Sequence, residues 1–216
     1  MSASAEALPL IIREPSSPRA DAFRVLRVRL EQSLAPQALR SLLVTSPGGQ
    51  EKRHEVAANL AGAFAECGIA TLLVDADLHH PALHELFGAA LAPGLLQAAV
   101  EPSAWRQSVR TTSLAGLSLL TAGGTDEVPA RVLGSRTLAP LLADMAKDGR
   151  TLVIVAPPVL AAADASLLAA QVDGVVLVTT ALRTSRTSLR DAKQRLEGSG
   201  ARILGAVLDG ATSASY

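Results

Sequence analysis

The sequence has one cysteine, Cys67, and aromatic residues make up only 2% of its 216 residues. A single cysteine excludes an internal disulfide, and no group of cysteines and histidines has the spacing of a zinc site. We expect Cys67 to be a buried thiol late in a helix. No apolar run is long enough to cross a membrane, and the N-terminus lacks the charged and apolar regions of a secretory signal. These absences predict a cytoplasmic protein.

An excess of charge of either sign is also missing. Lysine and arginine number 20, as do aspartate and glutamate, so the formal net charge is zero. We therefore expect neither nucleic acid nor an anionic membrane as a partner. The 49% hydrophobic content suits one domain with a sizeable core. Residues 1–18 are rich in serine, alanine and proline, and we expect a flexible arm there, followed by one domain at 19–216.

Short apolar runs alternate with segments of helical periodicity. The runs are residues 41–46, 70–75, 117–121, 151–155, 174–179 and 202–208. The helical segments are 19–34, 56–66, 80–87, 94–100, 136–147, 163–171 and 185–196. Strands without polar alternation, separated by helices, are typical of a parallel sheet covered on both faces. We predict an α/β fold with about six to eight strands, and we expect ligands at the carboxyl ends of the strands.

The loop after the first predicted strand has the setting of a P-loop, in which backbone N–H groups and a helix N-terminus cradle phosphates. The loop contains Gly48 and Gly49, but it departs from the pattern G-x-x-x-x-G-K-[ST] at its second half. Lys52 stands at the second glycine, Arg53 at the lysine and His54 at the serine or threonine that ligates Mg²⁺. The sequence thus predicts a P-loop-like fold that has lost catalysis.

An alternative register makes Lys52 the P-loop lysine. This one-residue shift would turn the side chains of the following helix by about 100° about the helix axis, relative to the first register. The run Val56–Ala61, which has the expected sequence in the first register, argues against the shift.

Five segments agree in order and spacing with the motifs of one family. They are Asp21–Arg27 (DAFRVLR), Thr45–Ala61, Leu72–Pro81 (LLVDADLHHP), Val153–Leu160 (VIVAPPVL) and Gly205–Asp209 (GAVLD). Together they resemble the cytoplasmic kinase domain of bacterial tyrosine kinases (BY-kinases), which are relatives of the ParA and MinD P-loop ATPases. The resemblance covers residues 21–209 and implies a place in capsule and exopolysaccharide export.

The resemblance assigns the site residues. Asp75 and Asp77 match the acidic residues of the second Walker motif. The resemblance implies that the first of them helps manage Mg²⁺ and the incoming hydroxyl in active relatives, although strand-end aspartates also cap turns. The third motif has Val155 and Ala156 in place of an acidic residue and threonine. Asp209 replaces an asparagine that usually faces the base.

We therefore expect no catalytic residue, no metal and no cofactor, with ATP and Mg²⁺ bound only if the site still functions. The degenerate nucleotide-binding positions are Gly48, Gly49, Lys52, Arg53, His54 and Asp209. The tyrosine-rich tail of the family is reduced to Tyr216.

Asp21, Arg24 and Arg27 resemble the family motif E-x-x-R-x-x-R, which packs neighbouring subunits into a ring. Arg24 and Arg27 share a helix face, and a solvated face is the alternative. The resemblance implies a homo- or hetero-oligomer.

The leading hypothesis is a catalytically degenerate scaffold or regulator in exopolysaccharide (capsule) biosynthesis and export. Its partner would be a membrane polysaccharide co-polymerase, or chain-length protein, which would hold it at the inner face of the membrane. One alternative is an active ATP-dependent tyrosine autokinase with a divergent loop. Another is a ParA/MinD-like positioning ATPase, which the absent early loop lysine and the lack of a basic tail after Asp209 disfavour.

Overall fold

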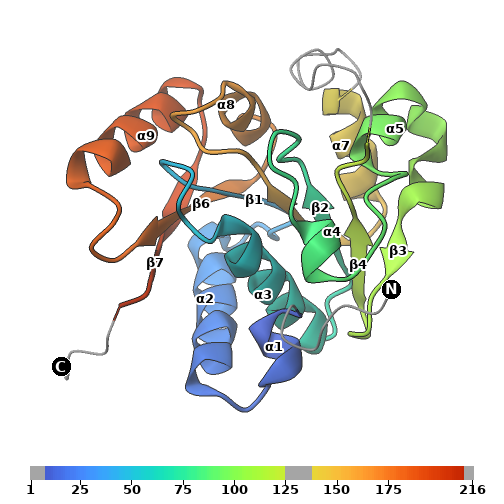
Figure 1. Cartoon of the computed structure of the whole chain (residues 1–216), viewed down its shortest axis with the longest axis horizontal. Helices are drawn as coiled ribbons and strands as arrows, with labels where there is room; N and C mark the ends of the chain where they lie inside the picture. Colours follow the sequence, from blue (N-terminus) through green and yellow to red (C-terminus); the bar gives the residue numbers. More distant parts are fainter. Residues whose placement is uncertain (1–7, 125–137, 212–216) are drawn as a thin grey trace.

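The computed structural model describes residues 8–124 and 138–211, and these form an α/β fold around one sheet (Figure 1). The strands are β1 (Ser41–Thr45), β2 (Thr71–Asp75), β3 (Arg110–Thr111), β4 (Leu117–Leu120), β5 (Thr151–Val155), β6 (Gly174–Thr180) and β7 (Ile203–Asp209). Their order across the sheet is β3-β4-β2-β5-β1-β6-β7. All neighbours are parallel except β3, which runs antiparallel to β4. The predicted mainly parallel sheet is confirmed.

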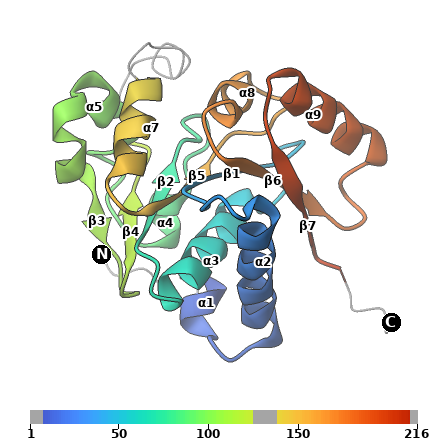
Figure 2. The same cartoon turned by 180° about the vertical axis from the view of Figure 1, so that it is seen from behind.

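The helices are α1 (Leu10–Arg13), α2 (Pro18–Leu34), α3 (Arg53–Glu66), α4 (Leu83–Leu86), α5 (Leu95–Val100), the 3₁₀ helix η1 (Pro102–Ser108), α7 (Leu138–Lys147), α8 (Asp164–Ala169) and α9 (Arg186–Gly198). In Figures 1 and 2, α2 and α3 cover one face of the sheet, and α7, α8 and α9 cover the other. Within the described residues, no helix has the length and apolar character needed to cross a membrane.

Two apolar clusters fill the space between the sheet and these helix layers. Successive side chains of a strand point to opposite faces. Accordingly, Leu42 and Val44 of β1 join the cluster under α2 and α3, whereas Leu43 joins the cluster under α7, α8 and α9. Burial on both faces explains why the interior positions of the central strands β1, β2 and β5 are apolar, and it leaves the ends of these strands for polar chemistry.

The N-terminal arm is partly a correction. Residues 8–18 were predicted to be flexible, but they include α1, in which the side chain of Ile11 is 1% exposed. The Ile11 N–H donates to Asn59 Oδ1 of α3 at 2.8 Å. A Cβ atom at Gly62 would lie 2.4 Å from Ile11 Cγ2, so this glycine permits the close approach of α1. A four-residue helix is too short to produce a periodic pattern. Residues 1–7 lie outside the described residues.

The start of α2 and the end of α3 each have a feature that bears on the predictions. The hydroxyl of Ser17 accepts from the Ala20 N–H at 3.2 Å, and Pro18 takes the first helical position, so α2 begins with favoured residues. Cys67 is the residue after α3, and it is exposed. The prediction of a buried thiol was therefore wrong. Helix α3 ends at Glu66, so Cys67 does not belong to its buried face.

Candidate functional site

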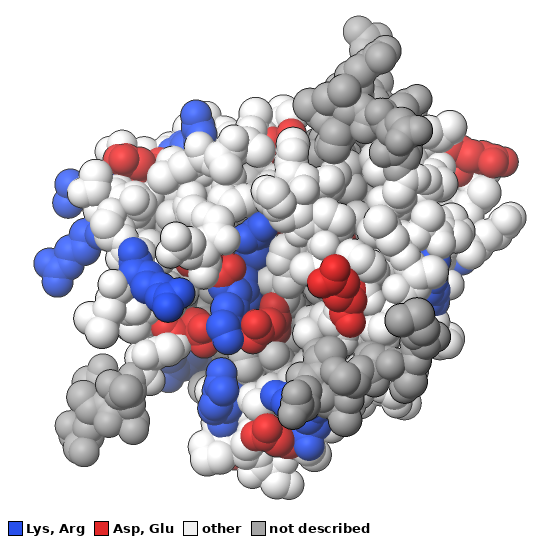
Figure 3. All heavy atoms as spheres, viewed as in Figure 1, with Lys and Arg blue, Asp and Glu red and all other residues white. Residues whose placement is uncertain are grey.

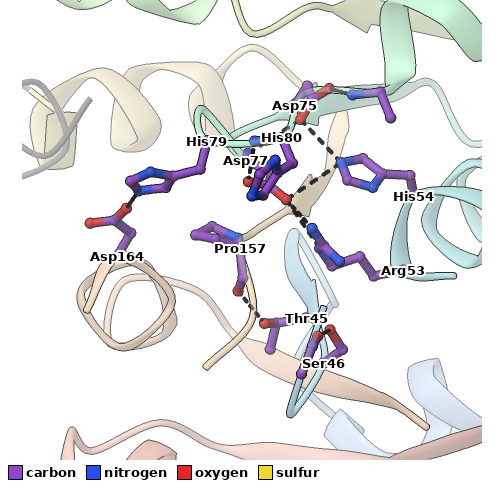
Figure 4. Close-up of polar contacts among 12 residues, drawn as sticks. Thr45, Ser46, Arg53, His54, Asp75, Asp77, His79, His80, Pro157 and Asp164 are labelled. Carbon is purple, nitrogen blue, oxygen red and sulfur yellow. Dashed lines mark hydrogen bonds and ion pairs between the residues drawn. The ribbon is translucent and has the colours of Figure 1, made fainter. Parts of the chain in front are cut away.

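The candidate site lies at the carboxyl ends of β1, β5 and β2, where the P-loop-like loop meets the turn after β2. Helix α3 begins at Arg53, with Lys52 as its N-cap residue. Arg53 and His54 thus belong to the first helical turn, three residues before the predicted start at Val56. Their side chains extend toward Asp75 and Asp77 (Figure 4).

Arg53 and Asp77 form a buried ion pair. The Arg53 Nε donates to Asp77 Oδ2 at 3.1 Å, and Nη2 makes a second, shorter contact with the same oxygen. The arginine side chain is 5% exposed and the aspartate is fully buried. Strand β5 separates β1 from β2 and ends at Val155, so the long arginine side chain reaches the carboxylate across a strand end that carries no charge.

His54 faces both carboxylates without bonding to either. Its Nε2 lies 3.6 Å from Asp75 Oδ1 and 3.8 Å from Asp77 Oδ2. Both distances exceed a hydrogen bond. This nitrogen is buried and has no hydrogen-bond partner in the described part of the chain. An imidazole therefore stands where the family pattern has the hydroxyl of serine or threonine.

The two aspartates organise the backbone after β2. Asp75 Oδ2 accepts from the Ala82 N–H at 3.1 Å and the Leu83 N–H at 3.0 Å. Its Oδ1 accepts from the Asp77 N–H at 3.2 Å. Asp77 Oδ1 accepts from the His80 N–H at 3.1 Å. Both carboxylates are thus engaged in holding the turn that leads into α4.

The other walls offer few free oxygen ligands. Val155 and Ala156 are fully buried and carry no polar side-chain atom. Thr45 Oγ1 donates to the Pro157 carbonyl at 2.7 Å, and Ser46 Oγ donates to the Gly48 carbonyl at 2.6 Å. Among residues 8–124 and 138–211, no group of three or more histidine, cysteine, aspartate or glutamate side chains could hold a metal ion.

Lys52 points away from the aspartates. Its Nζ lies 3.3 Å from Glu55 Oε2, and both side chains are about half exposed. Because Arg53 is the cation that reaches Asp77, this geometry supports the first register of the loop and not the alternative with Lys52 as the P-loop lysine. Glu55 lines the same hollow as Arg53 and His54.

Glu51 brings a negative charge to the loop. Its Oε1 accepts from Thr184 Oγ1 at 2.9 Å, and its buried Oε2 has no hydrogen-bond partner in the described residues. A Cβ atom at Gly48 would lie 3.5 Å from Glu51 Oε2, so the carboxylate packs over this glycine.

The remaining predicted positions are divided between two hollows. Gly49, Lys52, Arg53, His54 and Asp209 line an open hollow of about 700 Å³. Gly48 lines a neighbouring hollow of about 490 Å³, which also includes Gly49. Asp209 ends β7, and its Oδ1 lies 3.9 Å from Arg19 Nη2. Tyr216 lies outside the described residues.

One contact near the site was not predicted. His79 Nε2 and Asp164 Oδ2 lie 2.7 Å apart and join the turn after β2 to the first turn of α8. Asp164 is 5% exposed. The two residues are 85 positions apart in the sequence, so no local pattern could have indicated the pair.

The three interface candidates have partners within their own chain. Arg24 Nε donates to Glu66 Oε2 of α3 at 2.9 Å, and Nη1 donates to Asp21 Oδ1 at 2.7 Å. Hydrogen bonds to Asp21 and Glu66 raise the pKa of the Arg24 guanidinium. Arg27 Nη1 donates to Glu31 Oε2 at 2.6 Å. The bond between Arg24 and Glu66 fastens α2 to α3, the other two lie within α2, and an inter-subunit role for the arginines stays a prediction.

Comparison with known proteins gives the family. No family model matches the sequence. The chain is 31% identical over 201 residues to the tyrosine-protein kinase YwqD of Bacillus subtilis, across 93% of this chain and 85% of that protein. It is 30% identical to the putative tyrosine-protein kinase CapB of Staphylococcus aureus, across 93% and 89%. The succinoglycan biosynthesis transport protein ExoP of Rhizobium meliloti is 28% identical across 93% of this chain but 26% of that protein.

Solved structures agree with the sequence relatives. The chimerical protein CapA2B2 superposes with a TM-score of 0.87 and 28% identity, covering 96% of this chain and 91% of that one. The cell division ATPase MinD of Pyrococcus furiosus has a TM-score of 0.68 at 22% identity, covering 81% and 74%, and it shows the shared fold alone. The architecture is therefore that of P-loop ATPases, and the chain belongs to the family of bacterial tyrosine kinases.

Proposed function

We propose that this chain is a non-catalytic member of its family that acts as a scaffold or regulator in exopolysaccharide biosynthesis and export. The buried pair between Arg53 and Asp77 carries this proposal. Arg53, the cation at the P-loop lysine position, neutralises Asp77, an acidic residue of the second Walker motif. In an active site, the cation at this position binds phosphate, and the acidic residues bind the metal.

The side chains around the pair support a loss of magnesium binding. Mg²⁺ prefers near-octahedral oxygen ligands. His54 supplies nitrogen at the hydroxyl position, and Val155 supplies no ligand. Asp75 is engaged with backbone N–H groups. Freeing Asp77 would leave Arg53 buried and unpaired, at a cost of about 3–5 kcal/mol. The residues present do not fit Mg²⁺-ATP.

The loop itself supports a loss of phosphate binding. Lys52 replaces a glycine whose missing side chain lets backbone approach phosphate. Arg53 stands at the lysine position, but its guanidinium is bonded to Asp77 and is not free to hold a phosphate.

The relatives support the biological setting. ExoP is named a succinoglycan biosynthesis transport protein. That protein is about four times as long as the region that matches this chain. We propose that this chain works beside a membrane polysaccharide co-polymerase, with Arg24 and Arg27 near the surface shared with neighbouring subunits. Arg24 already bonds Glu66, so assembly would use the α2–α3 pair as one unit.

Titration of ATP with Mg²⁺ tests the proposal. We expect no rise in the melting temperature of the wild-type chain, since a ligand stabilises only in proportion to RT ln(1 + [L]/Kd). The variant Lys52→Gly/Arg53→Lys/His54→Ser/Val155→Asp should regain a magnesium-dependent rise. Val155→Asp alone, which leaves the Arg53–Asp77 pair in place, is the matched control and should not.

A saturable, magnesium-dependent shift in the wild type would contradict the proposal and favour the active autokinase. Mass spectrometry of purified protein incubated with ATP gives an independent readout, because phosphate on Tyr216 would require phosphoryl transfer. Loss of that phosphate in Asp77→Asn would assign the activity to this chain.

A further inference from the structure

The zero net charge of the chain conceals a strongly basic segment. Residues 181–202 hold six basic and two acidic side chains, a net charge of +4. They run from the end of β6 through α9 to the start of β7. In Figure 3, blue side chains gather on the side of the molecule where Figure 1 places α9 and β7.

The basic residues of α9 lie on an exposed flank. Ala192 and Leu196 are buried against the sheet, and Arg195 on the opposite flank donates to the Val159 carbonyl at 2.9 Å. Arg186 and Arg190, four residues apart, share the flank that faces away from this contact. Arg183 precedes the helix. The described residues provide no hydrogen bond or ion pair to the side chains of these three exposed arginines.

A protruding leucine stands beside these arginines. Leu182 has a φ of 63° and a side chain 107% exposed. It is the one residue other than glycine with positive φ in the described residues. Leucine is disfavoured there, and asparagine or glycine would fit better. The neighbouring Ala181 N–H donates to the Asp209 carbonyl at 2.9 Å, which places Leu182 beside the end of β7, where Leu208 is 58% exposed.

We propose that this surface, formed by Leu182, Arg183, Arg186 and Arg190, binds directly to an anionic membrane surface. Leu182 enters the boundary between headgroups and acyl chains, and the three arginines contact lipid phosphates. Arginine suits this role because its planar fork makes bidentate bonds to phosphate. The inference replaces the expectation from net charge, and it does not depend on whether the chain binds nucleotide.

The shape of the surface favours a membrane over a protein segment as its occupant. A side chain at full exposure has no surrounding groove that could seat a partner's side chain. A lipid bilayer needs no shape complementarity, and it supplies apolar surface and negative charge together. An acidic protein segment would use the arginines but leave Leu182 in water.

Vesicle sedimentation of the full chain tests the proposal. Vesicles of phosphatidylcholine mixed with phosphatidylglycerol should carry the protein down, and vesicles of phosphatidylcholine alone should not. Arg186→Ser/Arg190→Ser should weaken binding by about 25-fold, at about fivefold for each arginine. Leu182→Asn should weaken it by about tenfold, since the apolar side chain is lost. Asparagine suits the backbone at this position, so failure to fold will not obscure the result.

Matched controls lie elsewhere on the molecule. Val100 of α5 is 75% exposed, and Arg29 of α2 and Lys147 of α7 are exposed basic residues. Val100→Ser and Arg29→Ser/Lys147→Ser should bind as the wild type does. Absence of binding to the anionic vesicles, or binding that Leu182→Asn leaves unchanged, overturns the proposal. Binding to a glutamate-rich peptide without binding to vesicles overturns it as well, and assigns the surface to a protein partner.

Discussion

The loop after β1 and the turn after β2 meet at the same edge of the sheet, yet their side chains have different uses. In the turn, Asp75 and Asp77 agree with the family pattern, and both hold backbone N–H groups. In the loop, Lys52, Arg53 and His54 depart from the pattern, and only Arg53 makes a buried bond. The comparison teaches that the positions that agree with the family pattern are those whose carboxylates also hold the backbone in place.

The largest effect on stability is expected when Asp77 is removed. Asp77→Ala leaves the Arg53 guanidinium buried without a counter-charge, so we expect a loss of about 3–5 kcal/mol in the free energy of unfolding. Urea denaturation measures it. The double variant Arg53→Met/Asp77→Leu removes both charges and should stay close to the wild type. Equal stability of the single and double variants would show that the ion pair has no structural role.

A smaller effect is expected at Asp75. Asp75→Ala leaves the N–H groups of Ala82 and Leu83 without their acceptor, which should cost about 1–3 kcal/mol. Asp75→Asn keeps one carbonyl oxygen and serves as the control, with a smaller loss. Hydrogen exchange at these two amides gives a local readout. Unchanged protection in Asp75→Ala would mean that the turn does not rely on this carboxylate.

The smallest effect is expected at His54. Its Nε2 lacks a hydrogen-bond partner within the described residues, so His54→Ser breaks no bond at this atom, and we expect it to lower the free energy of unfolding by about 1 kcal/mol or less. On the proposed function, serine at this position should not confer magnesium binding while Arg53 still holds Asp77. A magnesium-dependent shift in this single variant would show that the imidazole, and not the ion pair, is what excludes the metal.

Much of the fold could be predicted because burial on both faces leaves a strong mark in the sequence. The uninterrupted apolar runs gave β1, β2 and β5 with boundaries close to those observed. Strand β3 has two residues and α1 has four, so neither is long enough for a pattern to emerge. The burial of α1 depends on Asn59 and Gly62 of α3, which are distant in sequence.

The site was harder to predict than the fold. The sequence motifs identified Arg53 and Asp77 as positions that differ in their agreement with the family, but they gave no sign that the two residues bond. The pair depends on the sheet order, which sets β5 between β1 and β2, and on Val155, which leaves the space between them without charge. The contact therefore depends on how β1, β2 and β5 lie together, which no single segment of the sequence reveals.

The Arg53–Asp77 pair has a consequence for how the chain would behave inside a working assembly. A domain that carries the counter-charge of its own acidic centre does not need a magnesium ion, brought with a nucleotide, to neutralise it. On the proposed function, its shape is the same whether cellular ATP is plentiful or depleted. It would then serve as a fixed reference point for neighbours that change state with each round of phosphorylation.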